Sequence, residues 1–100
     1  MPIRIFAGDA VDLRYDPEAK AFRADPALDG PSFQVQALDY FAAQAVLTET
    51  DDTAKVRACL QRGLVAVDGD QEKAKAFLAR PRARLVNPLF AAIWDETWGN

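Results

Sequence analysis

The side chains that could do chemistry are few, and histidine is not among them. The 100 residues contain no histidine and one cysteine, Cys59. The absence of histidine excludes imidazole bases, histidine-centred triads and the usual histidine-rich zinc sites. A nucleophilic cysteine needs a nearby cation or a helix start to lower its pKa. Cys59 instead falls between Val56 and Leu60 on the apolar face of a predicted helix, so we interpret it as a core residue.

Carboxylates alternate in the segment Asp68-Gly69-Asp70-Gln71-Glu72, as they do at the start of a calcium-binding loop. Such a loop needs glycine at its sixth position and glutamate at its twelfth, where this chain has Lys73 and Ala79. A turn followed by a helix that Asp70 caps is the better interpretation. The glycines match neither a P-loop nor a dinucleotide fingerprint. We therefore predict no catalytic residue, no metal site and no cofactor, and a protein that is not an enzyme.

A basic strip stands out from an acidic chain. Residues 71–84 carry a local charge of +4, whereas the whole chain has a net charge of −3, which leaves −7 for the remainder. An acidic body argues against a nucleic-acid-binding protein, whose domain is usually basic. The strip could still contact an acidic protein partner. Its candidate contact residues are Arg80, Arg82 and Arg84.

Trp98 is the other candidate contact residue. It follows Trp94 by four residues and therefore shares a helix face with it. Tryptophan is enriched at binding hot spots, which favours Trp98 as an anchor for a protein partner. The alternative is that Trp98 folds back onto its own domain, and the sequence leaves both interpretations open.

The elements that position these residues are predicted around the segment DDTAKVRACLQRGLVAVDGD, residues 51–70. Asp51 and Asp52 suit the first turn of a helix. Gly63 is the residue type that closes a helix in a left-handed conformation. The apolar run 64–67 should cross the core before the next turn.

The spacing of apolar residues and the positions of turn residues predict an α+β fold. We expect a single domain, residues 1–100, with a β portion at 1–31 and a mostly helical portion at 32–100. Short antiparallel strands are expected at about residues 3–7, 11–15, 20–24 and 33–37. Four helices are expected at residues 39–48, 51–62, 70–79 and 83–98.

Two predicted helices need further comment. In the first, the apolar face consists of Leu38, Phe41, Ala42, Ala45 and Val46. In the last, Asn87 is either an N-cap with Pro88 at the first helical position, or Pro88 lies inside a longer helix that starts near Pro81. The apolar stripe of this last helix is the strongest in the chain: Leu85, Val86, Leu89, Phe90, Ile93 and Trp94.

The expected compartment follows from what the sequence does not contain. It has no apolar run of the roughly 18 residues that a membrane span requires. The segment MPIRIFAGD does not have the pattern of a secretory signal, and a lone cysteine permits no internal disulfide. We expect a cytoplasmic protein without a membrane association.

From Phe33 onward the order of elements resembles the small tail assembly chaperones of long-tailed bacteriophages, prophages and gene-transfer particles. The resemblance covers residues 33–98. It is carried by a strand FQVQAL before a helix, a helix that ends in RGLVAVDGD, a short helix that ends in AFLARP, and the amphipathic segment LVNPLFAAIW.

The resemblance implies a non-enzymatic chaperone in the cytoplasm of a bacterial host. It would bind and solubilise the tape-measure protein before tail-tube protein polymerises around it, because a long helical rod with apolar seams aggregates unless it is covered. Homo-oligomerisation stays open. The alternatives are a structural virion protein, such as a head–tail connector or tail-terminator subunit, and a small protein-binding adaptor.

Overall fold

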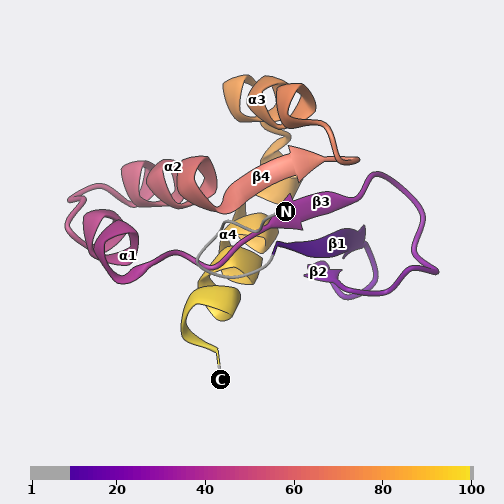
Figure 1. The fold of residues 1–100 in the computed structure, drawn as a ribbon, viewed down its shortest axis with the longest axis horizontal. Coiled ribbons are helices and arrows are strands. Elements are labelled where there is room, and N and C mark those ends of the chain that lie inside the picture. Colours follow the sequence, from indigo (N-terminus) through magenta and orange to yellow (C-terminus); the bar gives the residue numbers. More distant parts are fainter. Residues whose placement is uncertain (1–9, 100) are drawn as a thin grey trace, which may run out of the picture.

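The computed structural model describes residues 10–99, which form a four-stranded sheet and four helices (Figure 1). This confirms the predicted α+β class. The strand expected at 3–7 lies outside the described residues. The elements follow in the order β1 (Val11–Asp16), β2 (Ala21–Arg23), β3 (Phe33–Val35), α1 (Tyr40–Leu47), α2 (Asp52–Gly63), β4 (Leu64–Val67), α3 (Gln71–Ala79) and α4 (Ala83–Trp98).

The sheet is antiparallel throughout, with the strand order β2-β1-β3-β4. Leu13 of β1 lies opposite Phe33 of β3, which lies opposite Val67 of β4. The strand β4 is the apolar run that the sequence places across the core. Its four consecutive apolar residues have no period of two, so the pattern does not distinguish a strand from another buried segment.

The β1–β2 hairpin is closed by Asp16, a buried carboxylate. Its Oδ1 accepts hydrogen bonds from the backbone N–H groups of Glu18 (2.9 Å) and Ala19 (3.3 Å), and its Oδ2 accepts one from Arg23 (3.1 Å). The bond from the Ala19 N–H is the largest of the effects that lower the pKa of Asp16. The hairpin is therefore fixed by an ionised side chain, as well as by backbone pairing.

Aspartates cap the first three helices. Asp39, Asp51 and Asp70 accept hydrogen bonds from the first-turn amides of α1, α2 and α3, at 2.8, 3.0 and 2.8 Å. In contrast, α4 follows Arg82 without a side-chain cap and continues through Pro88. Of the two interpretations of Pro88, the longer helix is correct.

Strands and helices share one core. The largest fully buried side chains are those of Leu89, Ile93, Val35, Val46 and Cys59, which come from α4, β3, α1 and α2. The predicted placement of Cys59 in the core is confirmed, and burial raises the pKa of its thiol to about 12.

The prediction that Gly63 closes α2 in a left-handed conformation is wrong. Among the described glycines only Gly30 and Gly69 have positive φ, and Gly63 is the last residue of α2. A Cβ on Gly63 would lie 2.4 Å from Cγ2 of Ile93. The absence of a side chain on Gly63 therefore lets α2 and α4 approach closely at Ile93.

Candidate protein-contact surfaces

Four large apolar side chains are exposed on α1 and at the end of α4. Their exposed fractions are 64% for Tyr40, 80% for Phe41, 47% for Leu47 and 51% for Trp98. We call these four residues the aromatic surface. Large exposed apolar side chains can mark an interaction site, so we treat these four as candidate contact residues for a partner.

The predicted inward orientation of Phe41 is wrong. The helix α1 begins at Tyr40, and its buried positions are Ala43 and Val46. These residues are three apart and share a face, which leaves Phe41 on the opposite side. Adjacent positions on a helix are about 100° apart, so the pair Tyr40-Phe41 already indicated that at least one aromatic ring would point away from the core.

The last turn of α4 is hydrogen-bonded to the segment that leads into α1. The backbone N–H of Leu38 donates to Oγ1 of Thr97 at 2.9 Å, and Thr97 Oγ1 donates to the Ile93 carbonyl at 2.9 Å. This link holds the C-terminal end of α4 beside the segment that leads into α1 (Figure 1). Trp98 is among the predicted contact residues, whereas Tyr40 and Leu47 are not.

Trp98 also belongs to an aromatic column along α4. The rings of Phe90 and Trp94 are stacked, with centroids 5.7 Å apart, and Trp98 contacts Trp94 edge to face at 5.6 Å. Phe90 and Trp94 are half-buried, whereas half of Trp98 is exposed. Trp98 therefore packs on Trp94 of its own domain, and about half of its surface stays exposed. Its role as an anchor for a partner stays a prediction.

The basic strip lines a cavity at the other end of α4. This cavity, which we call the basic pocket, has a volume of about 610 Å³ and lies between α3, the start of α4 and the loop at 29–31. Arg80, Arg82 and Arg84 all line it and are exposed. The structure thus brings the three predicted arginines together.

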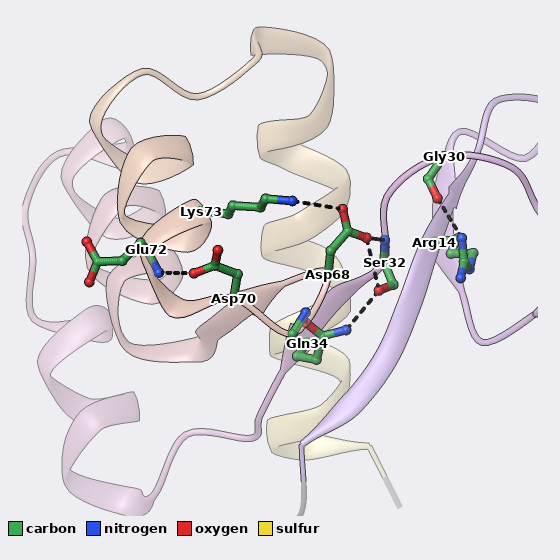
Figure 2. Close-up of polar contacts among 9 residues, drawn as sticks. Arg14, Gly30, Ser32, Gln34, Asp68, Asp70, Glu72 and Lys73 are labelled. Atoms are coloured by element: carbon green, nitrogen blue, oxygen red, sulfur yellow. Dashed lines mark hydrogen bonds and ion pairs between the residues drawn. The ribbon is translucent and has the colours of Figure 1, made fainter.

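The position of α3 beside this pocket depends on the turn after β4. Asp68 has a left-handed backbone (φ 53°), and its N–H donates to the Ser32 carbonyl at 2.7 Å. In return, the N–H of Ser32 donates to Oδ1 of Asp68 at 2.9 Å, and Gln34 accepts from the N–H of Gly69 at 2.8 Å (Figure 2). The turn is therefore fixed to the start of β3, and Asp70 then caps α3 as predicted.

The arginines of the strip have no ionic partner among residues 10–99, where the ion pairs are Arg23–Asp16, Lys73–Asp68 and Lys75–Glu72. The basic pocket also contains Lys73 and one carboxylate, Asp29. The Nζ atom of Lys73 lies 3.9 Å from Oδ2 of Asp68 (Figure 2). The local charge of the pocket is consequently positive.

The aromatic surface and the basic pocket are separate. Arg84 lies in the first turn of α4 and Trp98 is its last residue, which corresponds to about 20 Å at 1.5 Å per residue. The structure therefore does not place Trp98 and the three arginines in one site.

Neither surface contains a recognisable catalytic arrangement. Cys59 is buried and belongs to neither, while Asp95 and Glu96 are exposed on α4. Within residues 10–99, no cluster of three potential metal ligands is present, and no helix has the length and apolar character to cross a membrane.

The chain matches no protein-family model, no curated protein and no solved structure in the three comparisons made.

Proposed function

We propose that this protein is a non-enzymatic chaperone that shields apolar helical surface on a partner. The observation that carries the proposal is the aromatic surface, where Phe41 is 80% exposed beside Tyr40 at a ring distance of 5.4 Å. Aromatic side chains fixed on helices contribute large contact area at little entropic cost and are frequent at binding hot spots.

The resemblance to tail assembly chaperones supplies the identity of the proposed partner. The partner is the tape-measure protein of a phage tail or related particle, held soluble in the bacterial cytoplasm before tail-tube protein assembles around it. A long amphipathic helix presents apolar residues at helical spacing, and exposed aromatic side chains on α1 and α4 suit such a stripe. Charge at Arg80, Arg82 and Arg84, which line the basic pocket at the other end of α4, would affect mainly the rate of encounter.

Co-expression with the tape-measure protein tests the proposal. We expect the wild-type protein to keep the partner in the soluble fraction, and Trp98→Ala or Phe41→Ser to reduce this protection. Each change should weaken binding by about 2 kcal/mol, or roughly 30-fold, if the residue is a hot spot. Arg57→Ala, on an exposed part of α2, is the control that should protect normally.

The outcomes separate the proposal from its alternatives. If the wild-type protein gives no protection, the chaperone function is wrong. If it forms a stable closed ring that survives dilution and salt, a structural virion protein is the better assignment. If Trp98→Ala and Phe41→Ser protect as well as the wild type, the partner does not bind the aromatic surface.

A further inference from the structure

The basic pocket has an apolar floor. Phe33 and Phe77 meet edge to face with centroids 5.4 Å apart, and Val67 and Leu85 are buried next to them. Phe77 is half-buried and contributes its remaining exposed surface to the cavity. A ligand that fills this floor must offer an apolar group.

The wall of the same pocket attracts negative charge from two sources. Three arginines without a carboxylate partner among residues 10–99 surround it. In addition, the start of α4 has neither a side-chain cap nor an acidic residue in its first turn. The N–H of Leu85 donates to the Arg82 carbonyl at 3.0 Å, whereas the N–H groups of Ala83 and Arg84 have no acceptor among residues 10–99 and remain available.

The placement of Arg84 is unfavourable for the helix itself. A cation in the first turn of a helix opposes the helix dipole, which favours anions at this end. Positions that break a local rule of stability are commonly those that serve binding. The charge of Arg84 is therefore better explained by an external anion than by the stability of α4.

We propose that the basic pocket binds a short acidic peptide segment of a partner protein. The segment places one leucine or phenylalanine side chain on the floor formed by Phe33 and Phe77, and its carboxylates pair with Arg80, Arg82 and Arg84. Bidentate pairing with carboxylates suits arginine better than lysine. The proposed function requires these arginines only for the rate of encounter, and the aromatic surface lies at the other end of α4. This inference therefore holds or fails separately from the proposed function.

The size and charge of the surroundings favour a short segment over a long polyanion. The volume of about 610 Å³ falls within the range of about 300–1,000 Å³ found for sites that bind small ligands. Outside residues 71–84 the chain carries a charge of −7, so a nucleic acid that extends beyond the pocket would meet repulsion.

A fluorescence anisotropy titration of the full chain tests the inference. The peptide is a labelled pentapeptide with one leucine between two pairs of glutamates. We expect saturable binding that weakens about tenfold or more in Arg82→Glu and Arg84→Glu. Glutamate is favoured in the first turn of a helix, so Arg84→Glu should fold, and its melting curve verifies this.

Matched controls isolate the two parts of the recognition. Arg57→Glu makes the same charge change on α2, outside the pocket, and should bind the peptide like the wild type. A peptide with glutamines in place of glutamates should lose the charge contribution. A peptide with alanine in place of leucine should lose the apolar contribution, and both should bind at least several-fold more weakly.

Four results would overturn the inference. The first is no saturable binding by the wild type, and the second is equal loss in Arg57→Glu and Arg84→Glu. The third is that inorganic phosphate or an oligonucleotide competes for the pocket as strongly as the acidic peptide does, which would indicate a general anion site. The fourth is concentration-dependent self-association in sedimentation that excludes the peptide, which would assign the pocket to a second copy of this chain. None of them depends on whether the protein keeps a tape-measure protein soluble.

Discussion

Two regions of the molecule use similar apolar residues with opposite results. One is the contact between α2 and α4, and the other is the aromatic surface. At the helix contact, Leu89 and Ile93 are fully buried, and Gly63 has no side chain that would keep α2 away from Ile93. At the aromatic surface, Phe41 is largely exposed and Trp98 is about half exposed. The difference shows that apolar spacing identifies an amphipathic helix, whereas the helix start and a close helix approach decide which side chains are buried.

The labelling of Cys59 gives the largest expected contrast between these regions. Its thiol is fully buried beside the α2–α4 contact, so a thiol reagent should reach it only when the chain unfolds. For a small domain the ratio of folded to unfolded molecules is on the order of 10³–10⁸. Labelling in buffer should therefore be slower than in denaturant by a comparable factor, measured from the release of the reagent's chromophore.

The control for this measurement places a thiol on the aromatic surface. Cys59→Ala combined with Leu47→Cys should label rapidly in buffer, because Leu47 is half exposed. Equal rates for the two proteins would contradict the burial of Cys59.

The raised pKa of Cys59 adds a dependence on pH. The pKa is 9.0 ordinarily and about 12 in the folded protein, so above pH 9 only the unfolded chain readily loses the thiol proton. The contribution of this group to stability is complete below pH 9 and declines as the pH rises above it. Cys59→Ala should show a smaller decline between pH 8 and 10 in denaturant melts.

Leu89→Ala should have the next largest effect. Leu89 is fully buried in α4, and removal of its side chain leaves a cavity that costs about 2–5 kcal/mol of unfolding free energy. Trp98→Ala removes more atoms from a half-exposed position and should cost about 1 kcal/mol or less. Chemical denaturation of both variants compares the regions directly, and a larger loss in Trp98→Ala would reverse the comparison.

Gly63→Ala should have an intermediate effect of about 1–3 kcal/mol, because the added Cβ overpacks the contact with Ile93. Helix propensity alone predicts the opposite sign, since alanine is favoured over glycine by about 1 kcal/mol. In an Ile93→Ala background the clash disappears, and the same change should become neutral or stabilising. An additive double-mutant cycle would show that the two residues are not coupled.

Tyr40→Ser with Phe41→Ser should have the smallest effect on stability, within about 0.5 kcal/mol, because both side chains are mostly exposed. The double variant should nevertheless be more soluble than the wild type, as judged by light scattering at high concentration. A marked loss of stability would instead place these rings in the core.

Local chemistry was predictable from the sequence. The caps Asp51 and Asp70 bind amides only two or three residues away, so residue type was sufficient. The burial of Cys59 followed from its neighbours on one helix face. The arginines of the basic pocket were also visible as a strip, because they are close together in the chain.

Features that depend on packing between distant segments were not predictable. The floor of the basic pocket joins Phe33 to Phe77, which are 44 positions apart in the sequence. The role of Gly63 depends on where Ile93 lies, and β4 became recognisable only by its pairing with β3. In each case the residue type is visible in the sequence, whereas the distant residue that it contacts in the fold is not.

Pro88 gives one wall of the basic pocket a dynamic property. A proline has no N–H, so the carbonyl of Arg84, four residues earlier, loses its usual helical donor. The segment 83–87 is therefore joined to the rest of α4 by fewer backbone bonds, and Leu85 is its buried anchor. Such a turn opens at a lower free energy than the whole domain. We therefore expect the first turn of α4 to exchange its amide hydrogens faster than the remainder of the helix.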